Sequence, residues 1–320
     1  MCSFENFLAI FREHPIPSLG LPLNSKRKSF CFISFLFIFV CFFDIPTFPP
    51  IGILHSIYIL RMNLKQALSG AISRTLRFIG IIAVIYVSMV FYLALTERRN
   101  AYPRAISHNE ARAAIQETAR TAECTLEDGA TLNGWIVGNN DAPALLYYPG
   151  ADEDAAQFLA EIGTTDELRL ITFNYRGSAD NKGTPSQETF EPDAKAIAEC
   201  ASQLAGGRVQ FLAGRGTGAI LAAEQLGSGQ ALILIDPVES IADALSRKYR
   251  FLYPKFLVRS TVKMPINKLS EMSKQVSILF DRKNERDGAH TVFLKIPNSK
   301  AVERHGDSLK DILSKSIQKN

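Results

Sequence analysis

The sequence has few cysteines, and their spacing excludes the usual cysteine-based sites. The five Cys lie at positions 2, 31, 41, 124 and 200, with no Cys-x-x-Cys pair and no Cys/His cluster. Neither a structural zinc site nor a disulfide framework is therefore expected, and we predict that the protein holds no metal.

The chain also lacks a strong excess of one charge. Its 36 Lys and Arg exceed its 32 Asp and Glu by only four, and they are scattered, so we expect no nucleic-acid partner. The 47% share of hydrophobic residues excludes intrinsic disorder. A chain of 320 residues can form one large domain or two modest ones with a sizeable core.

Apolar residues are concentrated towards the N-terminus. Residues 78–95 form a run of 18 positions without a charge, which at about 1.5 Å per residue nearly matches a ~30 Å hydrocarbon core. Basic residues bracket this run at Arg74, Arg77, Arg98 and Arg99. We predict a transmembrane helix, with a cleaved signal peptide and a buried core helix as the alternatives.

The segment before this helix has a different composition. Its apolar run at residues 30–43 is short for a span and is followed by Pro46, Pro49 and Pro50. We interpret residues 1–61 as an extension upstream of a start at Met62, and residues 62–99 as the membrane anchor. With one span and the N-terminus inside, we expect a single-pass membrane protein whose globular domain lies on the extracytoplasmic side.

A polar linker is predicted for residues 100–120 and a globular domain for residues 121–317. In this domain, short apolar runs such as ALLYY, LRLITF and ALILI alternate with helical stretches. The alternation predicts an α/β fold with a doubly wound, mainly parallel sheet that helices cover on both faces. Because ligands bind beyond the carboxyl ends of such strands, four turns are candidates for a site: residues 148–152, 174–178, 214–218 and 305–307.

Several motifs in this domain occur in the order of a known fold family. The hairpin-like DGATLNGWIVG is followed by YYPGA, by FNYRGSADNKGTPSQE and by GRGTG on a predicted strand-to-helix turn. Together they resemble the α/β-hydrolase family, and in particular its membrane-anchored branch, over residues 121–317. The resemblance implies a relative of serine ester and acyl hydrolases, whose nucleophile would lie on the GRGTG turn.

The nucleophile position departs from the pattern of that family. The motif Gly-x-Ser-x-Gly reads Gly-Arg-Gly-Thr-Gly over residues 214–218, so Gly216 stands where the resemblance implies the serine. Glycine has no oxygen that could attack a carbonyl carbon. We predict a weak or inactive hydrolase; an active enzyme that uses Thr217 or another displaced nucleophile is the alternative.

The resemblance implies further site residues. It assigns the catalytic histidine to His305 and the acid to Glu285, with Asn284 in the neighbouring register. Asp281 and Asp287 are substitutes for the acid. The oxyanion-binding N–H groups would belong to Ala151 and Thr217.

Ligand or partner binding is the role that such a protein would retain. We expect a lipid-like or acyl ligand, and contact with the membrane through residues 78–95. We expect no cofactor.

A third interpretation concerns the same glycine-rich stretch. FLAGRGTGAILAAEQL also looks like the loop of an S-adenosylmethionine methyltransferase, in which Asp236 would bind the ribose. Leu212 stands where that loop should carry an acidic residue, and the FNYRG block would have no role. The methyltransferase therefore remains an alternative.

A basic segment follows the predicted strand that ends at Asp236. Residues 246–264 carry six basic side chains between Tyr, Phe and Leu residues: Arg247, Lys248, Arg250, Lys255, Arg259 and Lys263. Such a segment could face anionic lipid head groups; a solvated basic helix pair above the site is the alternative.

Overall fold

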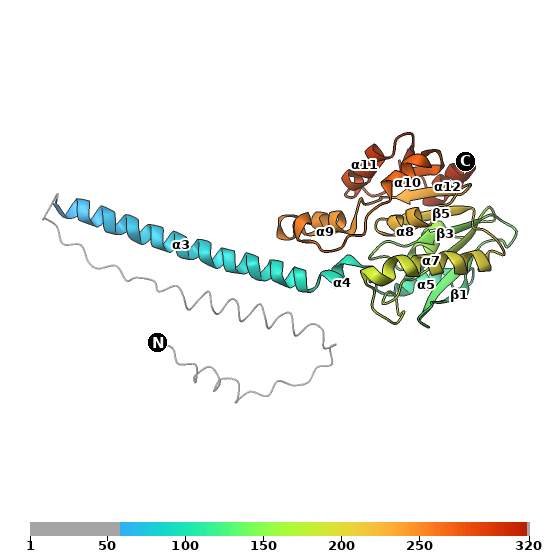
Figure 1. The fold of residues 1–320 in the computed structure, drawn as a ribbon, viewed down its shortest axis with the longest axis horizontal. Coiled ribbons are helices and arrows are strands. Elements are labelled where there is room, and N and C mark those ends of the chain that lie inside the picture. Colours follow the sequence, from blue (N-terminus) through green and yellow to red (C-terminus); the bar gives the residue numbers. More distant parts are fainter. Residues whose placement is uncertain (1–57, 319–320) are drawn as a thin grey trace, which may run out of the picture. The chain divides into compact units, whose positions relative to one another are not determined.

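The structure is a computed structural model that describes residues 58–318 (Figure 1). The globular domain is built on an eight-stranded sheet in the order β1-β2-β4-β3-β5-β6-β7-β8. The strands are β1 (Arg120–Thr125), β2 (Thr131–Val137), β3 (Ala144–Tyr148), β4 (Arg169–Phe173), β5 (Phe211–Arg215), β6 (Ala231–Ile235), β7 (Val276–Phe280) and β8 (Lys300–Glu303).

The sheet is mixed but mostly parallel. Strand β2 is antiparallel to both β1 and β4, whereas the strands from β4 across to β8 pair in parallel. The central strands β3 and β6 are buried along their whole length, as expected for a sheet that is covered on both faces. The predicted mainly parallel α/β sheet is confirmed.

Helices follow most of the strands. They are α4 (Glu97–Ala101), α5 (Asn109–Ile115), α6 (Ala155–Ile162), α7 (Gln187–Leu204), α8 (Gly218–Gln225), α9 (Ile241–Tyr249), α10 (Ile266–Glu271), α11 (Arg286–Lys295) and α12 (Leu309–Gln318), with the short 3-10 turns η1 (Arg250–Leu252), η2 (Lys255–Leu257) and η3 (Ser273–Gln275).

The two faces of the sheet bury separate apolar clusters. Side chains of α5, α6 and α12, such as Phe158 and Leu313, pack on one face. Side chains of α7, α8 and α9, such as Ile197 and Ile220, pack on the other face. The carboxyl ends of the parallel strands lie between these layers, and this arrangement positions the turns that form the site.

Local sequence determines where several helices begin. Asp154 caps α6 by accepting a hydrogen bond from the Ala156 N–H, and Gln157 completes a capping box. Ser240 caps α9 by accepting a hydrogen bond from the Asp243 N–H. Both helices therefore begin directly after a turn at the end of a strand, so their first residues lie next to the candidate site.

One long apolar helix precedes the domain. Helix α3 (Tyr58–Leu95) includes the predicted span at residues 78–95. Within the described residues, its part Leu68–Leu95, 28 residues long, is the one stretch that is long and apolar enough to cross a membrane. A signal sequence would have the same character. The short run at residues 30–43 and most of the predicted extension at residues 1–61 lie outside the described residues.

The segment predicted as a polar linker packs against the domain. Helices α4 and α5 form within residues 97–115, and Ala101, Tyr102 and Ile115 are buried. Tyr102 contacts the ring of Phe190 in α7 edge-on, at 5.4 Å between ring centroids. The segment that joins α3 to β1 is thus part of the folded core.

A disulfide joins two elements that are far apart in the sequence. Cys124 in β1 and Cys200 in α7 are bonded across 76 positions. The expectation that the cysteines form no disulfide is wrong for this pair. Spacing along the chain could not reveal it, because the packing of α7 beside β1 brings the two residues together.

Candidate functional site

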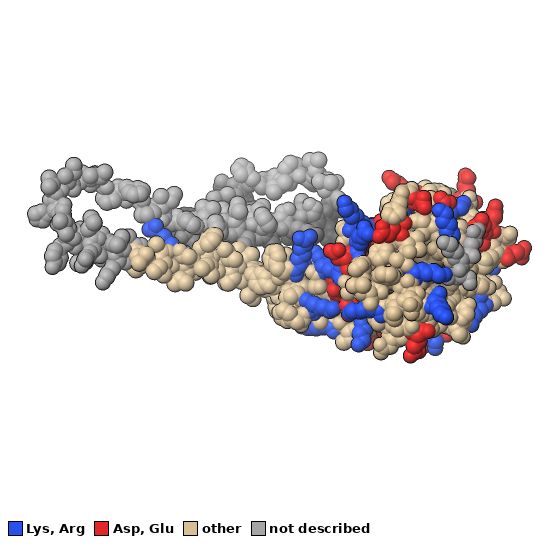
Figure 2. Space-filling model, turned by 90° about the horizontal axis from the view of Figure 1, so that it is seen from above, with Lys and Arg blue, Asp and Glu red and all other residues tan. Residues whose placement is uncertain are grey.

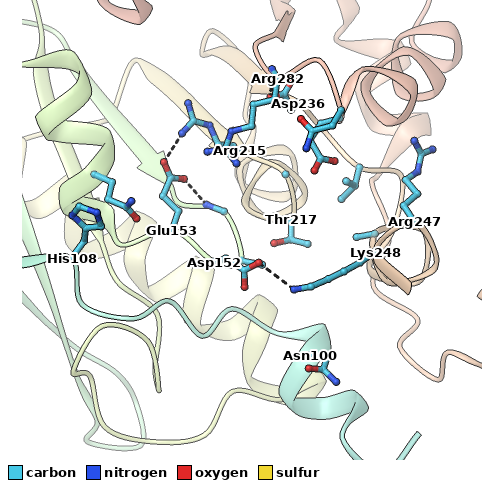
Figure 3. A pocket seen from close by; sticks show the side chains of 18 of the residues that line it. Asn100, His108, Asp152, Glu153, Arg215, Thr217, Asp236, Arg247, Lys248 and Arg282 are labelled. Atoms are coloured by element: carbon cyan, nitrogen blue, oxygen red, sulfur yellow. Dashed lines mark hydrogen bonds and ion pairs between the residues drawn. The ribbon is translucent and has the colours of Figure 1, made fainter. Parts of the chain in front are cut away.

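A cavity of about 1010 Å³ lies at the carboxyl ends of the parallel strands (Figure 3). Residues that follow β3, β5, β6 and β7 line it, together with residues of α4, α5 and α9. Two of the four candidate turns contribute, namely residues 148–152 and 214–218. The turns at residues 174–178 and 305–307 are not part of the lining.

The glycine-rich turn joins β5 directly to α8. Gly216 has a backbone φ of +56°, and a side chain added there would meet no atom within 4 Å. Gly214 and Gly218 are required for a different reason, because a Cβ atom at Gly214 would lie 2.5 Å from the Gly218 carbonyl oxygen and one at Gly218 would overlap the carbonyl oxygen of Pro149. At Gly214 and Gly218 the backbone of the turn therefore packs closely against other backbone atoms, whereas Gly216 has open space around it.

Thr217 follows at the start of α8 and lines the cavity (Figure 3). The residue is only 5% exposed. Its hydroxyl is buried without a hydrogen-bond partner in the structure. No imidazole or carboxylate is thus bonded to this hydroxyl, which is the partner that a hydroxyl nucleophile needs for activation.

The turn after β3 is organised by a buried carboxylate. Glu153 Oε2 accepts hydrogen bonds from the Gly150 N–H at 2.9 Å and from the Tyr147 hydroxyl at 2.7 Å. Burial, and then the negative charge of Glu153, raises the pKa of Tyr147 well above 10, so this hydroxyl stays a donor. The Gly150 N–H is therefore occupied, while Ala151, the predicted oxyanion donor, lines the cavity.

Arg215 connects this turn to the end of β7. Its Nη1 donates to Glu153 Oε1 at 2.6 Å, and its Nη2 donates to Asp281 Oδ2 at 3.0 Å. Arg304 donates to the other oxygen of Asp281, at 2.7 Å. The sequence analysis gave Asp281 as a substitute for the catalytic acid. Its two carboxylate oxygens instead bind two arginines, and these contacts link the end of β7 to β5 and to the residue after β8.

Asp236, at the end of β6, is a buried carboxyl group that lines the cavity. Its two oxygens accept hydrogen bonds from the Asp281 and Arg282 N–H groups, both at 2.9 Å. Burial raises the pKa of Asp236 from 3.8 to about 6, against the opposing effect of these hydrogen bonds. The pKa of this carboxyl group thus lies well above that of an exposed aspartate.

The predicted acid and histidine lie in different places. Glu285 and Asn284 line the cavity. His305 follows the edge strand β8, its side chain is 78% exposed, and its Nε2 lies 3.3 Å from Glu303 rather than near Glu285. The preceding residue, Arg304, is the one that turns inwards to Asp281. Asp287 lies in the first turn of α11 and is exposed.

The FNYRG block has a structural role. Arg176 donates two hydrogen bonds to Asp193 of α7, at 2.5 and 2.6 Å, and a third to Asp128 at 2.7 Å. Asn181 donates to the carbonyl oxygen of Asn174 at 2.7 Å. These bonds fasten the loop after β4 to the first hairpin and to α7. The Tyr175 hydroxyl also donates to the Pro149 carbonyl oxygen at 3.0 Å, so the block supports the turn after β3 from outside the cavity lining.

Sequence reasoning missed several residues of the site. The sequence analysis did not single out Arg215, Glu153 or Asp152. Arg215 could have been recognised, because it is a charged residue in the otherwise apolar strand β5, and a buried charge needs a partner of opposite charge. Lys248 was noted only as part of a basic segment; it lies 3.2 Å from Asp152 across the cavity (Figure 3). No group of metal-ligating side chains occurs in the part of the chain that the structure describes.

Comparison with known proteins gives weak sequence relatives. No family model matches the sequence. A stretch of 144 residues, 43% of the chain, is 26% identical to an uncharacterized protein of Mycobacterium tuberculosis strain H37Rv, and equally so to one of strain CDC 1551. The chain spans about half, 49%, of the length of these relatives.

Solved structures with which this chain aligns include an esterase and an α/β hydrolase. The esterase Pf2001 of Pyrococcus furiosus is 13% identical with a TM-score of 0.48, covering 68% of this chain and 96% of the esterase. An α/β hydrolase of Sphaerobacter thermophilus is 18% identical with a TM-score of 0.43, covering 61% of this chain and all of that one, 100%. The sheet of the globular domain is mixed, mostly parallel and eight-stranded.

Proposed function

We propose that the protein is a membrane-anchored α/β-hydrolase-like protein that binds a ligand in its cavity and has lost serine-type hydrolysis. The proposal rests on the glycine at position 216, where a hydrolase would carry its nucleophile. It occupies the strand-to-helix turn with a left-handed backbone and open space around it, as a nucleophile would, but it brings no oxygen to the cavity.

The other parts of a hydrolase site support the same conclusion. His305 is exposed and has Glu303 as its neighbour, so it is not placed to remove a proton at Gly216 or Thr217. The buried Glu153 carboxylate already binds the Gly150 N–H, and a negative charge beside the turn opposes a developing oxyanion. The geometry therefore suits binding better than acyl transfer.

The alternatives are less well supported. Thr217 brings a hydroxyl to the cavity, but no base is bonded to it. For a methyltransferase, Asp236 would have to bind ribose, yet both its carboxylate oxygens accept backbone hydrogen bonds from residues 281 and 282.

The cavity lining suggests an amphiphilic ligand. Val238 and Leu245 contribute apolar surface, whereas Asp152, Lys248 and the Thr217 hydroxyl contribute polar groups. The volume of about 1010 Å³ lies at the upper end of that usual for ligand sites. A lipid-like or acyl compound with a polar end meets these conditions.

Membrane attachment and topology complete the proposal. The 28-residue apolar helix Leu68–Leu95 supports a single-pass anchor. The disulfide between Cys124 and Cys200 supports an extracytoplasmic globular domain, because disulfides persist in oxidising compartments. Carbonate extraction of membranes tests the anchor: the full-length chain should stay in the membrane pellet, and its release into the soluble fraction would contradict it.

Labelling with a fluorophosphonate probe tests the loss of hydrolysis. Removing a triad nucleophile typically lowers the rate about 10⁶-fold and leaves about 10³–10⁴ over water. The purified full-length chain should therefore remain unlabelled beside a serine esterase as the positive control. Strong labelling that Thr217→Ala abolishes would overturn the proposal and establish the threonine nucleophile.

Mass spectrometry of compounds extracted from the purified chain tests ligand binding. The unaltered chain should retain an amphiphilic compound that Ala244→Phe, which fills the lined space, removes. Ala301→Phe, on the exposed edge strand β8, is the matched control and should retain it. Equal retention by both variants would show that the compound does not lie in this cavity.

A further inference from the structure

The segment after α9 is basic and carries exposed aromatic rings. Residues 246–264 contain six basic and no acidic residues. Arg250, Lys255 and Arg259 are exposed. Phe251 and Phe256 are 75% and 84% exposed. Exposed Phe side chains between Lys and Arg are typical of segments that lie in a membrane interface.

This exposure is unusual in the rest of the domain. Outside α3, the large apolar side chains that are exposed among the described residues are Ile106, Phe251, Phe256 and Leu294. Two of the four thus lie within one short segment. Figure 2 shows Lys and Arg side chains gathered on the part of the domain next to the apolar helix. Basic side chains and exposed apolar side chains therefore occur together in this segment.

A buried glutamate fastens this segment to the end of the apolar helix. Glu97, two residues after Leu95, is 7% exposed. Its Oε2 accepts a hydrogen bond from the Tyr253 hydroxyl at 2.7 Å. Its Oε1 accepts from the N–H groups of Arg259 and Ser260, at 2.7 and 3.1 Å. The segment is therefore held at the carboxyl-terminal end of the apolar helix.

A second contact reaches further along the helix. The Tyr86 hydroxyl donates to the carbonyl oxygen of Phe251 at 3.0 Å. Tyr86 lies nine residues before Leu95, which is about 14 Å along the helix axis. The turn η1 thus extends from the domain back beside the apolar helix.

The length of the helix accommodates this contact. The stretch Leu68–Leu95 has 28 residues and is about 42 Å long, roughly 12 Å more than a hydrocarbon core. Part of the excess lies at the amino-terminal end, where Arg74 and Arg77 direct their long side chains to the head groups. The polar backbone of η1 avoids hydrocarbon, so the remainder lies at the carboxyl-terminal end, beside η1. Phe251 is then at the boundary between the acyl chains and the head groups.

We propose that residues 247–259 form a docking surface for an anionic lipid bilayer. Phe251 and Phe256 enter the interface, and Arg250, Lys255 and Arg259 contact lipid phosphate groups. This inference rests on the membrane anchor of the proposed function. Arg247, Lys248 and Arg250 also line the cavity, so docking places the opening of the cavity at the membrane surface, where a lipid-like ligand can enter.

Tryptophan quenching by lipids with brominated acyl chains tests the docking. The full-length chain is placed in nanodiscs as Phe251→Trp or Phe256→Trp; the sequence has a single Trp, Trp135, which sets a constant background. Each added indole should lose at least about half of its emission, because it lies at the acyl-chain boundary. Leu294→Trp, on α11 and also mostly exposed at 69%, is the matched control and should not be quenched.

Changing the charge of the lipid, and then that of the protein, tests the contact with the head groups. Quenching of the Phe256→Trp variant should be stronger in nanodiscs with phosphatidylserine than with phosphatidylcholine alone. Adding the triple change Arg250→Gln, Lys255→Gln and Arg259→Gln should remove this difference, since each charge near an anionic surface contributes about fivefold in binding. The triple Lys195→Gln, Arg208→Gln and Lys274→Gln, with the same loss of charge, should leave it unchanged.

Ile82→Trp, on the exposed surface of α3, separates failure of the docking from failure of the anchor. If this variant is quenched and Phe251→Trp and Phe256→Trp are not, the docking surface is wrong and the anchor stands. If none of the three is quenched, both are wrong. Equal quenching of Phe256→Trp with and without phosphatidylserine would overturn the recognition of anionic lipid.

Discussion

Arg215 Nη1 lies 2.6 Å from Glu153 Oε1, and the two side chains are 6% and 8% exposed. This pair joins the turn after β5, which contains Gly216, to the neighbouring turn after β3. Because Arg215 also contacts Asp281 at 3.0 Å, a single guanidinium fixes three loops at the carboxyl ends of the sheet.

Removing Arg215 should be strongly destabilising. Arg215→Met leaves Glu153 and Asp281 buried without this cation, and breaking a buried pair in this way costs about 3–5 kcal/mol in the free energy of unfolding. Adding Glu153→Gln should recover part of the loss. Denaturant unfolding of the full-length chain in detergent measures both variants.

An exposed ion pair provides the control for that experiment. Lys195 and Glu199 lie 3.9 Å apart on α7 and are mostly exposed, so Lys195→Met should cost less than about 1 kcal/mol. If Arg215→Met is no more harmful than Lys195→Met, the buried network does not organise the site.

The three glycines of the turn should differ in their tolerance of alanine. Gly214→Ala and Gly218→Ala place a Cβ atom against backbone carbonyl oxygens, so we expect a loss of folded protein. Gly216→Ala meets open space and carries only the cost of its positive φ, about 1–2 kcal/mol. Thermal unfolding ranks the variants, and equal losses at Gly214 and Gly216 would contradict the close packing of the turn.

Gly216→Ser tests whether the rest of a hydrolase site remains. It should fold about as well as Gly216→Ala, because the site has room for the side chain. It should still resist a fluorophosphonate probe, because His305 is 78% exposed and lies beside Glu303. Labelling of Gly216→Ser, absent from Gly216→Ala, would show that a base reaches the turn.

The disulfide should contribute to stability. Bonding Cys124 to Cys200 closes a loop across 76 positions, and loss of such a bond typically costs about 2–4 kcal/mol. The pair Cys124→Ser and Cys200→Ser should therefore unfold at lower denaturant concentration. Before reduction, neither cysteine should react with an alkylating reagent under denaturing conditions; reaction of both would show that the bond does not form.

Asp236 should lower the stability of the folded chain as the pH rises, as expected for a buried acid with a raised pKa. Its pKa rises from 3.8 to about 6 on folding, so between these values the folded state binds more protons than the unfolded state. Stability should therefore fall as the pH rises from about 4 to about 6, by about 2–3 kcal/mol in total, and then level off. Asp236→Asn should lack this change.

The comparison of the two proteins across pH isolates this group from other titrating residues. The measured quantity is the difference in the free energy of unfolding between the unaltered chain and Asp236→Asn across the range from the unfolded-state pKa to neutrality. If the unaltered chain instead gains stability relative to the variant as the pH rises, the pKa of Asp236 is lowered and the burial argument fails.

Local sequence patterns were sufficient for the elements of the fold. The alternation of short apolar runs and helical stretches predicted a mainly parallel sheet, and glycines at 214, 216 and 218 indicated a sharp turn between β5 and α8. Such patterns act over a few residues, because burial alternates with the period of the strand or helix. The apolar run at residues 78–95 indicated a long helix for the same reason.

Pairing between distant residues was decided by the tertiary structure alone. The spacing of the cysteines gave no sign that Cys124 would meet Cys200, and the motif after β8 pointed to His305 although Arg304 is the residue that turns towards Asp281. Sequence order does not specify which of two neighbouring side chains faces inwards after an exposed edge strand, nor which charges share a buried site. Those choices depend on the packing of whole elements and on the need to pair each buried charge, as Glu153, Arg215 and Asp281 do.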